Sequence, residues 1–116
     1  MTLLTDSASL RTTSRYYIQR SYRYKATDRV FILKEAKLMG VGQLLNISQT
    51  GVAFQCEAWL DMRSRYILSI ERVADLPIQV VRRGEHVTYG ARFLITESRQ
   101  YSLGRFLKER YKEGEA

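Results

Sequence analysis

Side chains alternate between apolar and other residues from Val87 to Ile95, and this pattern constrains the fold more than any other stretch of the sequence. Successive side chains of a β-strand point to opposite faces, so the alternation predicts a strand with one buried face. That face would carry Val87, Tyr89, Ala91, Phe93 and Ile95. The preceding link, Arg83-Gly84-Glu85, is short and contains glycine, which favours a hairpin. We therefore expect an antiparallel sheet.

Five shorter apolar stretches upstream have the character of strands and are separated by residues typical of turns. They cover residues 30–33, 41–47, 52–56, 66–70 and 78–80, with turns predicted at 34–37 and at Asp75-Leu76-Pro77. Residues 98–112 instead show helical spacing, with an apolar stripe of Leu103, Phe106, Leu107 and Tyr111. The sequence thus predicts an all-β fold with a terminal helix. A six-stranded antiparallel β-barrel would hide its sheet edges, and the C-terminal α-helix would plug or flank it.

The length of 116 residues is typical of one domain with a single core. Residues 1–14 are rich in Thr and Ser and are predicted to form a flexible tail, and residues 15–116 to form a single barrel domain with its helix. No run approaches the roughly 18 apolar residues of a membrane-spanning helix, so no membrane span is expected. The lone cysteine, Cys56, shares a strand face with Phe54 and is expected in the core. Because nothing requires an oxidising compartment, we expect a cytoplasmic protein.

The formal net charge of +7 is distributed unevenly along the chain. Residues 11–37 hold two acidic side chains, Asp28 and Glu35, against eight basic ones: Arg11, Arg15, Arg20, Arg23, Lys25, Arg29, Lys34 and Lys37. Such a segment attracts anions, and arginine pairs well with phosphate groups. A basic surface that only keeps the protein soluble would have the same composition.

The sequence contains no arrangement of residues that is typical of a catalytic or metal site. The single histidine, His86, follows a hairpin glycine and has no carboxylate or cysteine partner at motif spacing. No phosphate loop, nucleophile elbow or dinucleotide fingerprint is present. We therefore predict a protein that is not an enzyme and that uses no cofactor and no metal.

The run Asn46-Ile47-Ser48-Gln49-Thr50-Gly51 places small polar groups and one glycine between two apolar strands. Asn and Ser side chains at a strand end can donate and accept hydrogen bonds, and Gly51 has no Cβ to block an approaching ligand. The same residue types also build ordinary hairpins, so local pattern alone favours a structural turn.

Two motifs and their spacing resemble the PilZ domain family, whose hallmarks are RxxxR and (D/N)xSxxG. The first corresponds to Gln19-Arg20-Ser21-Tyr22-Arg23, and the second to Asn46–Gly51, which begins 23 positions after Arg23. Tyr89-Gly90-Ala91-Arg92-Phe93-Leu94 is similar to the closing strand of the family, so the resemblance spans about Gln19 to Tyr111. It implies a six-stranded barrel that binds the bacterial second messenger cyclic di-GMP.

The resemblance assigns the site residue by residue. Arg23 matches the second arginine of the first motif, and the second motif is matched by Asn46, Ser48 and Gly51. The family's first arginine is replaced by Gln19, which is neutral, and Arg20 lies one position along. The predicted cyclic di-GMP site is therefore Arg20, Arg23, Asn46, Ser48 and Gly51, with Gln19 as a further candidate.

Three functions remain open, in this order. The first is a cyclic di-GMP receptor that relays the signal to a downstream protein partner by a conformational change. The second is a PilZ-like adaptor that binds no nucleotide and acts through protein contacts, since the family includes such members and Gln19 departs from the motif. The third is a basic barrel that binds single-stranded nucleic acid through residues 15–25, where tyrosines alternate with cations.

Overall fold

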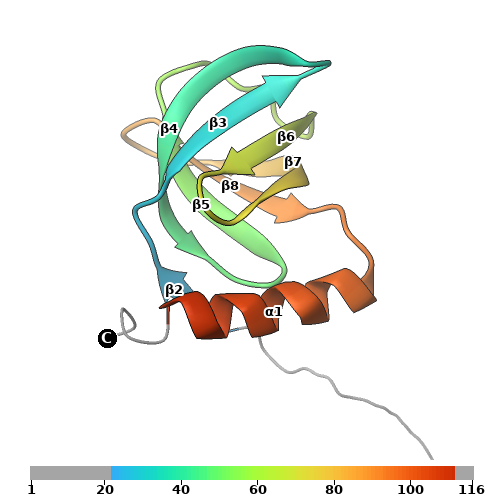
Figure 1. Ribbon diagram of the computed structural model, residues 1–116. Coiled ribbons are helices and arrows are strands. Elements are labelled where there is room, and N and C mark those ends of the chain that lie inside the picture. Colours follow the sequence, from blue (N-terminus) through green and yellow to red (C-terminus); the bar gives the residue numbers. More distant parts are fainter. Residues whose placement is uncertain (1–21, 112–116) are drawn as a thin grey trace, which may run out of the picture.

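A computed structural model describes residues 22–111, which form a closed six-stranded antiparallel β-barrel with one C-terminal helix (Figure 1). The elements are β2 (Tyr24–Lys25), β3 (Arg29–Lys34), β4 (Lys37–Ile47), β5 (Gly51–Cys56), β6 (Arg65–Ile70), β7 (Ala74–Arg83), β8 (Thr88–Phe93) and α1 (Glu97–Tyr111). The predicted fold class is thus confirmed.

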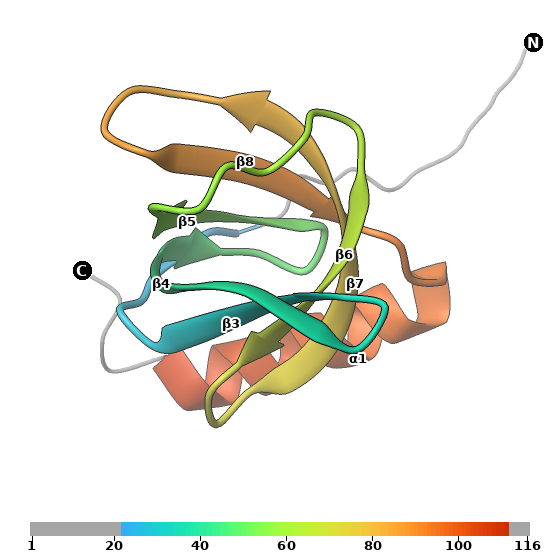
Figure 2. The same ribbon diagram turned by 90° about the horizontal axis from the view of Figure 1, so that it is seen from above.

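The barrel closes because β4, the longest strand, pairs on both sides. The strands follow the order β4-β3-β6-β7-β8-β5, and β5 then pairs with β4 through contacts such as Leu44 with Phe54. Figure 2 shows this ring from above. The two-residue strand β2 was not predicted, and it lies outside the ring, where Tyr24 pairs with Ile47 and Lys25 with Asn46.

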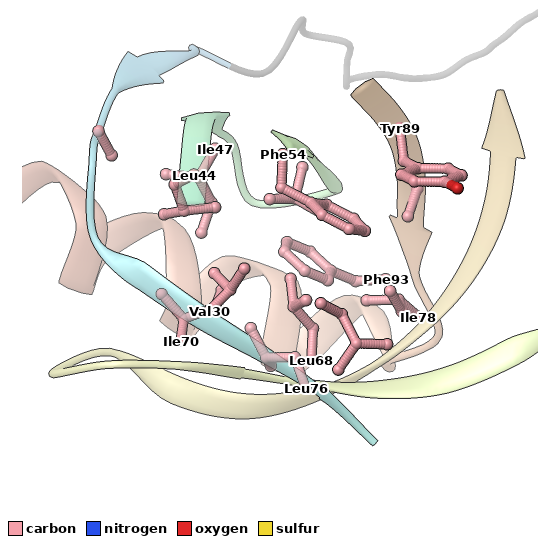
Figure 3. Packing of buried hydrophobic residues seen from close by; sticks show 14 of the residues in the cluster. Val30, Leu44, Ile47, Phe54, Leu68, Ile70, Leu76, Ile78, Tyr89 and Phe93 are labelled. Atoms are coloured by element: carbon pink, nitrogen blue, oxygen red, sulfur yellow. The ribbon is translucent and has the colours of Figure 1, made fainter. Parts of the chain in front are cut away.

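The core fills the barrel with side chains from every strand of the ring, as period-two alternation requires. Phe54, Leu68 and Ile78 are completely buried, and Figure 3 shows them meeting near Phe93. Cys56 is also buried, as expected, and burial raises the pKa of its thiol above the usual range.

Helix α1 lies across one end of the barrel (Figure 1). Its first turn is capped by Thr96, whose hydroxyl accepts a hydrogen bond from the Arg99 amide at 3.2 Å. Leu103, Leu107 and Tyr111, spaced four residues apart, are the buried side chains. Phe106 was predicted to share this stripe, but 43% of its surface is exposed, because the buried face is narrower than the predicted one.

The predicted turn at Asp75-Leu76-Pro77 is wrong. The chain turns at residues 71–73 instead, and the three residues lie within β7. Pro77 pairs with Ile67 of β6, and its carbonyl accepts a hydrogen bond from the Leu94 amide at 2.8 Å, beyond the last residue of β8. Proline therefore occupies the end of the β7–β8 ladder, where a missing amide hydrogen is tolerated.

Two hairpins also differ from the predicted strand boundaries, because they use left-handed residues other than glycine. Glu35 and Ala36 have φ of 52° and 65°, which is the geometry of a tight turn that matches strand twist, so β4 begins at Lys37 rather than at residue 41. His86 and Val87 have φ of 59° and 52°, so β8 begins one residue after Val87.

Candidate functional site

A row of paired residues crosses four strands on the outer surface of the barrel. Arg82 of β7 pairs with Gly90 of β8, Gly90 with Ala53 of β5, and Ala53 with Asn46 of β4. The two central residues are glycine and alanine, so the middle of the row is a flat floor of backbone. Polar side chains stand at its two ends.

A β-bulge at each end of this row turns the polar residue outward. The ladder between β4 and β5 skips Leu45, and the ladder between β7 and β8 skips Val81. An extra residue breaks the strict alternation of faces. Asn46 and Arg82 consequently line the groove on the barrel surface, rather than pointing inward like the completely buried Leu44 and Val80.

Arg23 closes the Asn46 end of the row. Its guanidinium donates a hydrogen bond to Asn46 Oδ1. Partial burial, and then the positive charge of Arg82, lower the pKa of Arg23 below its usual value, although the side chain remains exposed and protonated at neutral pH. Arg23, Arg82 and Arg92 line a groove of about 440 Å³.

Arg82 and Arg92 were missed by the sequence prediction. A Cβ on Gly90 would come within 3.2 Å of the Arg82 guanidinium carbon, so Gly90 lets that side chain lie over the floor. Arg92 pairs with Gly51 and donates a hydrogen bond to Gln79 Oε1 at 3.0 Å. Within residues 22–111, no salt bridge joins either arginine to a carboxylate. Arg92 lies in the Tyr89–Leu94 segment that resembles the closing strand of the PilZ family, so the sequence offered a signal for it. No recognised motif contains Arg82.

The serine of the second motif is placed differently from the sequence prediction. Ser48 is completely buried, and its hydroxyl accepts hydrogen bonds from the amides of Thr50 and Gly51, each at 3.2 Å. The Ser48 amide in turn donates to the Gly51 carbonyl at 2.8 Å. In this structure Ser48 fixes the turn and does not line the groove.

Gly51 lines the groove, but packing alone also requires a glycine there. A Cβ at this position would lie 2.7 Å from the Ala91 carbonyl oxygen of β8. Of the predicted site residues, the structure therefore brings Arg23, Asn46 and Gly51 together, with Ser48 beneath them. Gln19 and Arg20 lie outside the described residues.

The chemistry of the groove favours binding of an anion. Its lining contains three arginines and no Asp or Glu: Arg23, Asn46, Thr50, Gly51, Val52, Ala53, Val81, Arg82, Gly90, Ala91 and Arg92. Across the described part of the chain, no group of three or more metal-ligating side chains is found either. His86 lies apart on a hairpin tip, 3.9 Å from the carboxylate of Glu85, and is largely exposed.

A larger hollow of about 860 Å³ lies elsewhere on the molecule, beside Asp28. Its wall mixes acidic Asp28, Glu57 and Glu71 with basic Arg29, Arg72 and Arg110. Three charges of each sign, with Arg110 and Asp28 already paired, leave no net attraction for an anion. The smaller groove is the better candidate, because its charged side chains are all cationic.

A family model for the PilZ domain matches residues 10–109 of the sequence. The chain belongs to the PilZ family. No curated protein sequence matches the chain significantly. The match extends the family region upstream of the described residues and includes the position of Gln19.

Solved structures of PilZ domains share the fold. The PilZ domain of CeSA from a cellulose-synthesising bacterium is 19% identical, with a TM-score of 0.59 over 77% of this chain and 97% of its own. The PilZ domain of Escherichia coli YcgR with c-di-GMP is 13% identical, with a TM-score of 0.59 over 83% and 96%. An uncharacterised Legionella protein is 17% identical, with a TM-score of 0.56 over 80% and 97%.

PilZ domains are binding domains, and this chain has their barrel and helix. Its α1 is too short and too polar to cross a bilayer, and the described residues contain no other α-helix.

Proposed function

We propose that the protein is a receptor for cyclic di-GMP, which it binds in the groove bounded by Arg23, Arg82 and Arg92. The observation that carries the proposal is this arrangement of three arginines and Asn46 around a floor of Gly90 and Ala53. Membership of the PilZ family and the fold shared with the YcgR domain support the same ligand. A second messenger acts inside the cell, so the proposal includes the cytoplasmic location predicted from the sequence.

Cyclic di-GMP carries groups that complement the cationic side chains of the groove. Cyclic di-GMP carries two phosphates and two guanines, and an arginine fork pairs bidentately with a phosphate or with the O6/N7 edge of guanine. Partial burial, and then the positive charge of Arg82, lower the pKa of Arg23, and the second of these effects is a repulsion between the two guanidinium groups. A dianion between them would replace this repulsion with attraction.

The two motifs would contribute in different ways. Arg23 and Asn46 would contact the ligand directly, whereas Ser48 would act by holding Thr50 and Gly51 in place through its hydroxyl. Arg20, three residues before Arg23, would supply the cation that Gln19 lacks. We propose that the bound state is read by a downstream protein partner.

Isothermal titration calorimetry with cyclic di-GMP tests the proposal. We expect saturable binding with micromolar or weaker affinity, weakened by about 1–3 kcal/mol in Arg23→Ala if the contact is bidentate. Arg65→Ala, an exposed arginine on β6 that does not line the groove, is the matched control and should bind normally. Absence of heat at millimolar nucleotide would refute the receptor function.

The adaptor function is the second candidate, and one further observation favours it. Trp59 is 70% exposed and is held in place by the Arg83 guanidinium, which lies 3.8 Å from the ring centre. Arg83 is itself fixed by donating a hydrogen bond to the Leu60 carbonyl at 2.6 Å. A rigid exposed tryptophan is typical of the residues that anchor protein interfaces. Binding of a protein partner that is lost in Trp59→Ala, together with silent calorimetry, would favour the adaptor.

A further inference from the structure

Helix α1 contains a glycine at its middle, Gly104, between the buried residues Leu103 and Leu107. Glycine in a helix interior lowers helix stability relative to alanine, so its presence calls for a local reason. The side chain of Gln49 lies on it. A Cβ at position 104 would lie 3.2 Å from Gln49 Cδ and 3.4 Å from Gln49 Cβ, and it would overlap Gln49 Oε1.

Gln49 belongs to the turn that forms one wall of the groove. It lies between Ser48, whose hydroxyl accepts hydrogen bonds from two amides, and Thr50, which supplies one of them. Thr50 and Gly51 both line the groove. Figure 1 shows this turn, which joins β4 to β5, lying directly above α1. A displacement of the Gln49 backbone by the helix would therefore move two groove residues.

The last turn of α1 contacts the residue next to Arg23, which closes the same end of the groove. The Tyr111 ring stacks on Tyr24 with the ring centres 6.0 Å apart and an interplanar angle of 27°. Tyr24 is buried, and it directly follows Arg23. Tyr111 is held in place by donating a hydrogen bond to Asp28 at 2.9 Å. Tyr24, next to Arg23, and Gln49 of the Asn46–Gly51 turn thus contact the same helix.

We infer that α1 positions the groove and that Gly104 is a positioning residue, acting through Gln49. Its significance for nucleotide binding rests on the proposed function. Because the helix contacts Tyr24, next to Arg23, and Gln49, next to Thr50, the docking of α1 and the binding of ligand are linked. Such linkage is reciprocal, so a bound nucleotide would also tighten the docking of the helix.

A double-mutant cycle tests the inference, with Gly104→Ala, Gln49→Ala and the two combined. Alanine at position 49 removes the two atoms that a new Cβ would approach most closely, Oε1 and Cδ. Gly104→Leu adds a larger side chain in case Gln49 avoids the methyl group by changing rotamer. Ser102→Ala is the control, because it also raises helix propensity but lies at an exposed position of α1.

Two measurements are made on every variant: the amide NMR shifts of Thr50 and Gly51 without nucleotide, and calorimetry with cyclic di-GMP. We expect Gly104→Ala to move both amide signals and to weaken binding about fivefold, and Gly104→Leu about tenfold or more. Adding Gln49→Ala to Gly104→Ala should bring signals and affinity back to those of Gln49→Ala alone. A merely structural effect of helix propensity would act in the opposite direction, since alanine stabilises a helix.

Unchanged Thr50 and Gly51 signals in both Gly104 variants would overturn the inference. So would a defect that persists when Gln49 is truncated, because Gly104 would then act by another route. If the wild-type protein binds no cyclic di-GMP while the amide signals move and are rescued, the receptor function fails and the positioning role of α1 stands.

Discussion

Arg82 is the residue that most clearly separates a binding site from a solvated basic surface. Arg82 lies over Gly90, and its positive charge adds to the effect of burial in lowering the pKa of Arg23. No salt bridge within residues 22–111 compensates either charge. A pair of cations held together without an acidic partner costs free energy, and an anionic ligand offsets that cost.

Replacing Arg82 with methionine should therefore weaken binding without lowering stability. Arg82→Met keeps a long stem but removes the guanidinium, so we expect cyclic di-GMP to bind about tenfold more weakly, within the range for loss of a bidentate contact. Thermal unfolding should be unchanged or shifted upward, because the repulsion with Arg23 disappears. Arg65→Met is the control for both measurements. An unchanged affinity would exclude Arg82 from the site.

Gln19 departs from the family motif, and restoring the arginine there should strengthen cyclic di-GMP binding rather than weaken it. Gln19→Arg restores the first arginine of the family motif and should tighten cyclic di-GMP binding about tenfold, since charge-assisted hydrogen bonds contribute about 1.5–3 kcal/mol before side-chain ordering is subtracted. Calorimetry on Gln19→Arg and Arg20→Ala decides whether position 19 or position 20 corresponds to the first arginine of the motif. If Arg20→Ala abolishes binding and Gln19→Arg changes nothing, Arg20 already fills the role of the missing arginine.

At the scale of elements, the sequence predicted the inner face of the barrel well and the outer site only in part. Buried side chains such as Phe54 and Phe93 follow from alternation within each strand. The bulges at Leu45 and Val81 do not, because a bulge depends on how two strands pair, and nothing within one strand reports it. Arg82 therefore stayed hidden, while Asn46 was found only through its motif.

The contact that fastens the end of α1 to the barrel is pH-sensitive at high pH. Burial first, and then the hydrogen bond to Asp28, raise the pKa of Tyr111 from 10.0 to about 12. The folded state thus favours the neutral phenol. This contribution to stability is complete below about pH 10 and is lost as the pH rises to about 12.

Tyr111→Phe should remove that pH dependence while keeping the ring stacked on Tyr24. At neutral pH the variant should be less stable by about 1 kcal/mol, because the hydrogen bond to Asp28 is lost. Unfolding free energies measured from neutral pH to about pH 12 check both points, and a ring-carbon NMR titration reports the pKa of Tyr111 itself. A parallel decline in the wild type and in Tyr111→Phe would mean that another group causes it.

In the whole molecule, a closed barrel carries a short strand that is attached much less firmly. The six strands of the ring share long ladders, whereas β2 contributes only the pairs of Tyr24 with Ile47 and Lys25 with Asn46. Arg23, immediately before β2, is the residue that reaches the groove. A ligand held by Arg23 and Asn46 would bridge β2 and β4 and so add to this weak pairing.

Hydrogen exchange should therefore locate the response to cyclic di-GMP in β2 and the adjacent turn. Two-residue pairing opens easily, so amides of Tyr24, Lys25 and the 46–51 turn should exchange faster than those of β8 without ligand. Saturating cyclic di-GMP should slow their exchange, extending over residues 15–25, because each opening would also break ligand contacts. Amides of β8, which lies within the ring, serve as the internal control and should change little. If β2 is already as protected as β8 without ligand, the conformational response must lie in another element, and α1 is then the next to measure.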